Sequence, residues 1–191
     1  MSLKKSIYAD VWRIYGKQGP LYVLKGFLVK KTFRPIITYR LGRASKDLPF
    51  LLKIMIHLPV KLLHRWLTGS LCCELPFSAK IGPGFLLNHG YVVVLSKSCS
   101  IGNNFTCLHE VTIGEVRGST LAPVLGNNVV IAAKVMVAGN IKIGNGATIG
   151  AGALVLKDVP ELAIVVGNPQ RVLRYSDEPR TPNPAPSYLL D

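Results

Sequence analysis

The sequence predicts a mainly β protein, a solenoid of short stacked coils preceded by a basic α-helical region. Three observations carry this prediction. Apolar residues recur every six positions between residues 101 and 155, glycine follows many of them, and positive charge is concentrated before residue 67. A six-residue period fits neither an amphipathic helix nor an isolated alternating strand. Self-similarity at a short fixed period is instead typical of coils that bury a shared core.

Two apolar columns define the repeat. The first column consists of Ile101, Cys107, Ile113, Leu125, Ile131, Val137, Ile143, Ile149 and Val155. The second, two residues earlier in each unit, consists of Phe105, Val111, Val129, Val135, Ile141, Ala147 and Ala153. Glycine follows the first column at positions 102, 114, 126, 144 and 150, and Gly and Asn tolerate positive φ. Each unit is therefore expected to form a short strand and a tight corner.

This pattern resembles the hexapeptide-repeat acyltransferases, in which an aliphatic residue and Gly are followed by four variable residues. The resemblance covers about residues 75–175. It implies a left-handed parallel β-helix of about five coils, a homotrimer with sites between subunits, and acetyl-CoA as co-substrate. We expect a basic helical region at 1–73, an acyltransferase domain at 74–175 and a Pro-rich tail at 176–191, extended or disordered because its apolar content is low.

Residues 1–66 hold fourteen Lys and Arg against two Asp, so nearly all of the net charge of +13 lies there. Short helices are expected at 4–16 and 19–31, and residues 48–67 interleave apolar residues with Lys and His. Its apolar part at 48–60 is interrupted by Lys53 and His57 and is too short to span a bilayer, whose core needs about 20 apolar residues. The arm is interpreted either as a surface that contacts an anionic membrane or as a helical cap over the open end of the solenoid. Nucleic acid is not expected as a partner, because no binding motif accompanies the charge.

Within this arm, residues 34–43 contain the adjacent pair Tyr39 and Arg40. The segment resembles the linker that precedes the repeats in colanic-acid-type and serine acetyltransferase-like proteins.

The four cysteines, Cys72, Cys73, Cys99 and Cys107, show neither disulfide nor metal-ligand spacing. They are interpreted as small buried residues in a reducing compartment. The first residues lack the apolar core of a secretory signal. We expect a cytoplasmic protein, with peripheral contact at the inner face of the cytoplasmic membrane if the arm binds lipid. No metal is expected.

The catalytic prediction rests on His89. Residues 86–95 resemble the Asp-His-x-x-Gly-Ile-Val-Ile motif of serine acetyltransferases, with Asn88 and Val92 in place of its Asp and Gly. The resemblance implies that His89 is a general base, and a neutral imidazole suits removal of a hydroxyl proton. His109, twenty residues later, is expected one coil along on the same face, where adjacent strands lie about 4.8 Å apart. It is a candidate second catalytic or acceptor-binding group.

The polar stretch between residues 114 and 124 loses the inward columns. It predicts a loop that leaves the coil and forms one wall of the active site, with a backbone N–H near Gly114 to stabilise the oxyanion. The candidate acceptor-binding residues are Asn88, Glu110, Glu115 and Arg117.

The resemblance also implies the acetyl-CoA contacts. It places the pantetheine arm against the small residues Gly114, Ala133 and Ala151, and the CoA phosphates near Lys157 and Arg171.

The loop also bears on the acceptor. Ala122 and Leu121 stand where serine enzymes have a second His and an Arg, so serine is disfavoured as the acceptor. The expected function is O-acetylation of a sugar hydroxyl in a polysaccharide or glycan precursor. The alternatives are transfer to serine or another small hydroxyl or amine, and a catalytically silent membrane-docked scaffold.

Overall fold

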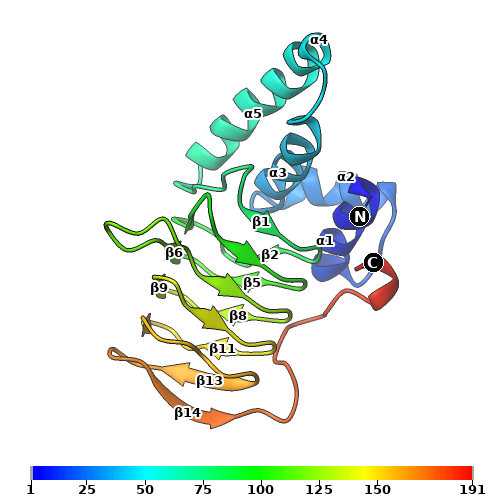
Figure 1. Cartoon of the computed structure of the whole chain (residues 1–191). Helices are drawn as coiled ribbons and strands as arrows, with labels where there is room; N and C mark the ends of the chain where they lie inside the picture. Colours follow the sequence, from blue (N-terminus) through cyan, green and yellow to red (C-terminus); the bar gives the residue numbers. More distant parts are fainter. Residues whose placement is uncertain (1, 191) are drawn as a thin grey trace.

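The computed structural model describes residues 2–190 and places a helical region at one end of a β-helix, with the C-terminal tail running back along its side (Figure 1). The helices are α1 (Leu3–Tyr15), α2 (Pro20–Val29), α3 (Phe33–Ser45), α4 (Phe50–Leu52) and α5 (Leu58–Gly69). A π-helical turn, η1 (Lys53–His57), joins α4 to α5 without a break. The helices expected at 4–16 and 19–31 correspond to α1 and α2 and are confirmed.

Three parallel sheets form the β-helix, one on each side of the coils. The first sheet contains β1 (Lys80–Ile81), β4 (Ser100–Ile101), β7 (Val124–Leu125) and β10 (Lys142–Ile143). The second contains β2 (Leu86–Leu87), β5 (Thr106–Cys107), β8 (Val130–Ile131), β11 (Thr148–Ile149) and β13 (Ala163–Val166), closed by the antiparallel β14 (Arg171–Tyr175). The third contains β3 (Val94–Leu95), β6 (Thr112–Gly114), β9 (Met136–Ala138) and β12 (Leu154–Val155). The predicted parallel β-helix is confirmed. It has four complete coils and a partial fifth formed by Val159 and β13, whereas about five coils were expected.

The core of the β-helix consists of the two predicted columns. Every member of both columns is buried, from Ile101 and Phe105 to Val155 and Ala153. Neighbouring coils pair in register, so that Leu125, for example, lies between Ile101 and Ile143. Burial of these aliphatic side chains, at about 25 cal/mol per Å² of apolar surface, is what holds strands of two or three residues together.

The glycine at each corner has a different role from the one expected. The left-handed conformation is adopted by Asn104 and Asn128, not by the preceding Gly102 and Gly126. A Cβ built on Gly102 would lie 2.7 Å from the backbone carbon of Gly126 in the next coil. These positions therefore require glycine because successive coils approach closely there, and not because their φ is positive.

Helix α3 caps the first coil. Tyr39 donates its hydroxyl to the carbonyl oxygen of Ala79 at 2.6 Å, and Arg43 donates to the same oxygen at 2.6 Å. Arg40 donates to the carbonyl oxygens of Ile81 and Gly82 at 2.6 and 2.7 Å. The segment that resembles a linker is therefore a buried helix whose donors satisfy the carbonyls at the open end of the solenoid. Of the two interpretations of the basic arm, the helical cap applies to α3.

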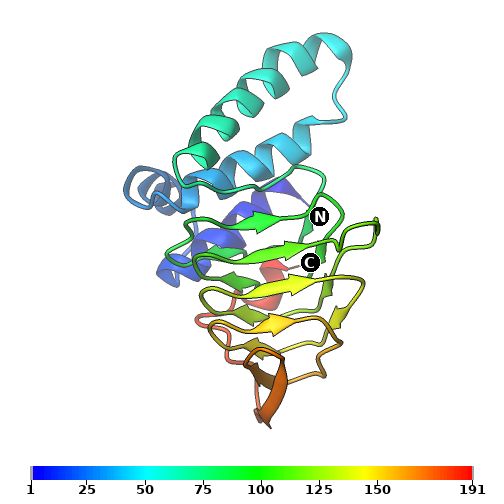
Figure 2. The same cartoon turned by 90° about the vertical axis from the view of Figure 1, so that its left-hand side faces the viewer.

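Helices α3 and α5 form a hairpin that extends beyond the first coil (Figures 1 and 2). His64 of α5 fixes the hairpin, because its Nδ1 lies 2.8 Å from Thr38 Oγ1 and its Nε2 lies 2.8 Å from the carbonyl oxygen of Leu75. The outer face of the segment from α4 to α5 is apolar. It exposes Leu51, Met55, Leu58, Leu62 and Trp66, at 73, 73, 47, 62 and 69%.

The tail is extended, as expected, but it is packed rather than disordered. Thr181 Oγ1 donates to the carbonyl oxygen of Asn128 at 2.7 Å, and Ala185 N donates to Asn104 Oδ1 at 2.9 Å. A short 3-10 turn, η2 (Ser187–Leu189), then packs against α1 through Leu189. The polar corner residues of the β-helix thus hold a segment of low apolar content in place.

Cys73, Cys99 and Cys107 are buried free thiols, as expected, whereas Cys72 is exposed because it lies in the turn after α5. Burial raises the pKa of Cys99 to about 11.

Among residues 2–190, none of the helices has the length and apolar content needed to cross a membrane.

Candidate active site

His89 lies in a two-residue insertion at the corner between the second and third sheets. Leu87 pairs with Cys107, twenty residues on, but Leu95 pairs with Ile113, eighteen residues on. The two extra residues form a tight turn in which Tyr91 N donates to the carbonyl oxygen of His89 at 2.8 Å and His89 has φ 54°. The insertion pushes the imidazole outward, and His89 and Asn88 are both exposed.

His109 lies one coil along from His89, as predicted, but the register gives it a different neighbour in the preceding coil. The carbonyl oxygen of Tyr91 accepts from Glu110 N at 2.8 Å, and that of His109 accepts from Lys134 N at 3.0 Å, so Tyr91 and His109 occupy equivalent positions. His109 therefore stacks on Tyr91 rather than on His89, because the insertion changes the register between the two coils. His109 is half-buried at the same corner as His89, one coil along.

Ala133 and Ala151 continue the column that begins with Tyr91 and His109. Gly152 N donates to the carbonyl oxygen of Ala133 at 2.9 Å, which places Ala151 one coil beyond Ala133. The corner therefore changes from large side chains on the first two coils to small ones on the next two. Ala133 and Ala151 thus form a strip of two small side chains along the β-helix from the histidines, with the exposed Lys134 beside it.

A pocket of about 500 Å³ lies at the His89 corner. Its wall on the β-helix side includes Asn88, His89 and Tyr91, and the tail contributes Pro182. The opposite wall comes from the helical region, with Arg13 of α1 and the turn after α2. The polar side chains of the helical wall belong to Arg13, Lys30, Lys31 and Thr32.

Reasoning from the sequence missed this helical wall. The Lys30-Lys31 pair is visible in the sequence as part of the basic arm, but no local pattern indicates that the arm folds back beside residue 89. The contact depends on how α1 and α2 pack on the first coil.

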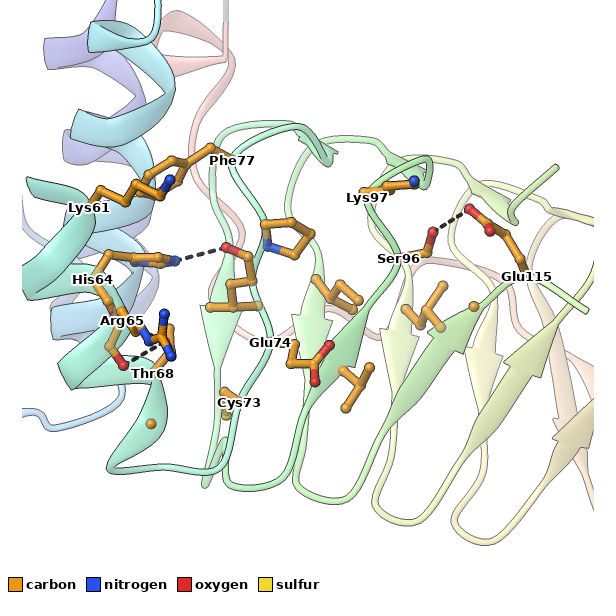
Figure 3. Close-up of a pocket in the computed structure, with 17 residues that line it drawn as sticks. Lys61, His64, Arg65, Thr68, Cys73, Glu74, Phe77, Ser96, Lys97 and Glu115 are labelled. Atoms are coloured by element: carbon orange, nitrogen blue, oxygen red, sulfur yellow. Dashed lines mark hydrogen bonds between the residues drawn. The ribbon is translucent and has the colours of Figure 1, made fainter. Parts of the chain in front are cut away.

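Gly114 and Glu115 lie at a different corner, beside α5. They line a cavity of about 810 Å³ between α5 and the third sheet, with Lys61, Arg65 and Lys97 (Figure 3). Ser96 donates to Glu115 Oε1 at 2.8 Å, and this hydrogen bond lowers the pKa of Glu115. Within one chain, Glu115 thus faces this cavity, and Gly114 ends β6 at the edge of the third sheet away from the His89 corner.

The remaining acceptor candidates are dispersed. The Glu110 carboxylate lies 3.9 Å from Lys134 Nζ on the surface, and Arg117 is exposed in the loop at 115–123. This loop leaves the coil as predicted, since residues 115–123 contain no strand.

Lys157 and Arg171 lie close together near the C-terminal end of the β-helix. Gln170, the residue before Arg171, binds the backbone of this segment, because its Oε1 accepts from the backbone N–H groups of Leu156 and Lys157 at 2.7 and 2.9 Å, and its Nε2 donates to the carbonyl oxygen of Lys157 at 3.1 Å. Both basic side chains are exposed and available to phosphate. Among residues 2–190, no group of three His, Cys, Asp or Glu side chains is arranged to hold a metal ion.

The family model described as bacterial transferase hexapeptide (six repeats) matches residues 122–157. The Escherichia coli K12 protein WcaB, which is named for acetyl transfer in colanic acid biosynthesis, is 41% identical over 116 residues, covering 60% of this chain and 72% of WcaB. The chain belongs to the hexapeptide-repeat transferase family.

Other members of the family are similar as well. Serine acetyltransferase 3, mitochondrial, of Arabidopsis thaliana is 44% identical over 115 residues, which cover 59% of this chain and 29% of the plant protein. The match thus spans less than a third of that relative. Serine acetyltransferase of Brucella abortus S19, in a structure with coenzyme A, superposes with a TM-score of 0.75 at 26% identity, covering 91% of this chain and 68% of that one. The resemblance on which the fold prediction depends is confirmed.

Proposed function

We propose that this hexapeptide-repeat transferase is an acetyl-CoA-dependent O-acetyltransferase that acts on a sugar hydroxyl of a polysaccharide or glycan precursor. The observation that carries the proposal is the position of His89, which is exposed in a pocket at the corner from which the strip of Ala133 and Ala151 runs along the coils. The likeness to WcaB supports a glycan acceptor, and the Brucella complex supports coenzyme A as carrier.

In the proposed reaction His89 removes the proton from the acceptor hydroxyl. The oxygen attacks the acetyl carbon, and the thioester carbonyl becomes a tetrahedral oxyanion. Collapse of that intermediate breaks the C–S bond, and the imidazolium returns its proton to the leaving thiolate. The products are the acetyl ester and free CoA. General-base catalysis of this kind contributes on the order of 10² to 10⁴ in rate.

The pantetheine arm is proposed to lie along the strip of Ala133 and Ala151, with the CoA phosphates near Lys157 and Arg171. The direction of the strip supports this placement, because it leads from the His89 corner toward the end of the β-helix that carries both basic residues.

We propose a homotrimer as the active form. Exposed apolar residues on the third sheet side support it, since Met136 and Leu156 are 48 and 51% exposed in one chain and contact between copies would bury them. A trimer also allows the Gly114 corner of one copy to complete the His89 site of the next. Light scattering should give a mass about three times the chain mass of 20.8 kDa.

Peripheral membrane contact is proposed for the α4 to α5 arm, with the protein at the inner face of the cytoplasmic membrane. The exposed apolar face from Leu51 to Trp66 supports it, because Lys53, Lys61 and Arg65 accompany that face. Apolar side chains flanked by cations suit an anionic bilayer surface, where each nearby Lys or Arg adds about 1 kcal/mol.

A serine acceptor is the second candidate, and it is favoured by the serine acetyltransferases among the relatives. The replacement of their His and Arg by Ala122 and Leu121 distinguishes this chain from them.

The decisive experiment follows free thiol release from acetyl-CoA with a panel of sugars, oligosaccharides and serine. Glycan-dependent release that is lost in His89→Ala, with acetyl-CoA binding retained, is the expected result. Serine-dependent release would establish the second candidate. Absence of acetyl-CoA binding would instead favour the catalytically silent scaffold.

A further inference from the structure

The His89 pocket carries an excess of positive charge. Arg13, Lys30 and Lys31 line it, and none of its lining residues is acidic. Among residues 2–190, no carboxylate lies within ion-pairing distance of these three cations. A concave site lined only by positive charges concentrates anions, because its low-dielectric walls focus the electric field.

The charge of Arg13 is buried and fixed. Its side chain is 3% exposed, and its guanidinium donates to the carbonyl oxygens of Gly84 and Pro182 and to Thr106 Oγ1, at 2.7, 3.1 and 2.6 Å. All three acceptors are neutral. Burial lowers the pKa of Arg13 to about 10, so it stays charged at neutral pH.

The nearest buried carboxylate is already paired. Asp10 accepts from Arg40 Nε and Nη2 at 2.8 and 2.9 Å, and from Phe85 N at 2.8 Å. One carboxylate therefore faces two buried guanidinium groups, and the cluster of Asp10, Arg13 and Arg40 has a net charge of +1. That surplus charge borders the pocket through Arg13.

The two lysines are held on an ordered turn. Lys30 N donates to the carbonyl oxygen of Gly26 at 2.8 Å, and Phe33 N donates to that of Lys30 at 3.0 Å. Arg34 donates to the carbonyl oxygens of Phe27 and Leu28, both at 2.7 Å, which fixes the end of α2. The ammonium groups thus start from a defined backbone position opposite His89.

We propose that the pocket recognises an anionic acceptor, in which a carboxylate or phosphate on the sugar pairs with Lys30 and Lys31 while a hydroxyl reaches His89. This inference rests on the proposed function and names its substrate class. Charge-assisted hydrogen bonds to lysine would hold the acidic group, and Arg13 would add a long-range field. A neutral sugar would leave the cations without a partner.

The test measures equilibrium binding of glucuronate, glucose 1-phosphate and glucose by calorimetry, at low and at raised NaCl. The proteins are the full chain, the double variant Lys30→Gln/Lys31→Gln, and the control Lys17→Gln/Lys25→Gln. The control removes the same charge from the same arm but away from the pocket. We expect glucuronate or glucose 1-phosphate to bind more tightly than glucose, with affinity about tenfold or more weaker in the pocket variant and little changed in the control. Which of the two binds identifies the acidic group as carboxylate or phosphate.

The proposal would be overturned if glucose bound as tightly as the two anionic sugars, or if both double variants lost affinity equally. It would also be overturned if none of the three sugars bound. Competition between acetyl-CoA and glucose 1-phosphate would also overturn it, because the lysines would then serve the CoA phosphates. Failure of the proposed function is distinguishable, since it would appear as absent thiol release and absent acetyl-CoA binding in the unmodified protein.

Discussion

Arg40 donates from Nε and Nη2 to the two carboxylate oxygens of Asp10, at 2.8 and 2.9 Å, and both side chains are buried. Burial opposes the charge on Arg40, but Asp10 outweighs this effect and raises the pKa of Arg40. The pair joins α1 to α3, and Asp10 also accepts from Phe85 N of the first coil at 2.8 Å. Two helices and the open end of the β-helix therefore meet at one ion pair.

Replacing Asp10 by Asn should destabilise the protein by about 3–5 kcal/mol, because it leaves two buried guanidinium groups without a counter-charge. Thermal or denaturant unfolding measures the change. Asp47→Asn is the control, since that carboxylate is 84% exposed in its ion pair with Lys46 and should contribute less than about 1 kcal/mol. Equal effects of both variants would contradict a dominant role for the buried pair.

Replacing Val92 by Gly should raise stability by about 1 kcal/mol. Val92 has φ 55°, a conformation that costs a β-branched residue about 1–2 kcal/mol, and the flexibility of Gly offsets part of the gain. A rise in melting temperature of about 2–4 °C is expected. Val124→Gly is the matched control, because Val124 has similar exposure, 44% against 47%, but lies in β7, so Gly should lower its stability. A lower melting temperature for Val92→Gly would refute the strain argument.

The packing of α5 on α3 should weaken at acidic pH. Burial lowers the pKa of His64 from its ordinary value of 6.5, and the hydrogen bond to the Leu75 carbonyl opposes this only in part. A lowered pKa in the folded state means that the unfolded chain binds the proton first. The contribution of neutral His64 is therefore complete above pH 6.5 and is lost as pH falls from there through the folded pKa.

Melting temperatures between pH 8 and pH 5 measure this effect. His64→Gln should show a smaller fall over that range than the unmodified protein. An unchanged pH profile in His64→Gln would show that other groups govern it.

The two histidines of the corner should differ in kinetics. His89→Ala should reduce kcat by about 10² to 10⁴, as expected for loss of a general base. His109→Ala should retain measurable turnover and change KM as well, because His109 lies in the column of Ala133 and Ala151 along which the pantetheine arm is proposed to run. Steady-state thiol release measures both variants, and equal losses of kcat would assign both side chains to the chemical step.

Vesicle sedimentation tests the membrane proposal. Phosphatidylcholine vesicles containing phosphatidylglycerol should bind the protein, whereas vesicles of phosphatidylcholine alone should bind it weakly. Leu62→Ser/Trp66→Ser should abolish binding. The control Leu173→Ser changes a residue of similar exposure, 58%, on β14 at the far end of the molecule and should bind normally (Figure 1). If the double variant binds vesicles normally but loses self-association, the face is an interface between copies.

The sequence by itself determined the β-helix, both inward columns, the helices α1 and α2, the loop at 115–123 and the corner that carries His89. The coils, the columns and the break at the loop follow from local periodicity, because each six-residue unit repeats the same strand and corner. The helices follow from the composition of the basic arm, and the role of the His89 corner follows from the resemblance to serine acetyltransferases. A period that is read within a few residues needs no knowledge of distant contacts.

Only the tertiary structure decided the rest. The two-residue insertion stacks His109 on Tyr91 instead of His89, and backbone pairing between coils is needed to locate it. Tyr39 and Arg40 cap the first coil from a helix, and Lys30 and Lys31 reach the His89 pocket from residues nearly sixty positions earlier. Such contacts are set by how amphipathic helices pack on the end of a solenoid, which depends on the shapes of both surfaces and not on the pattern of either one.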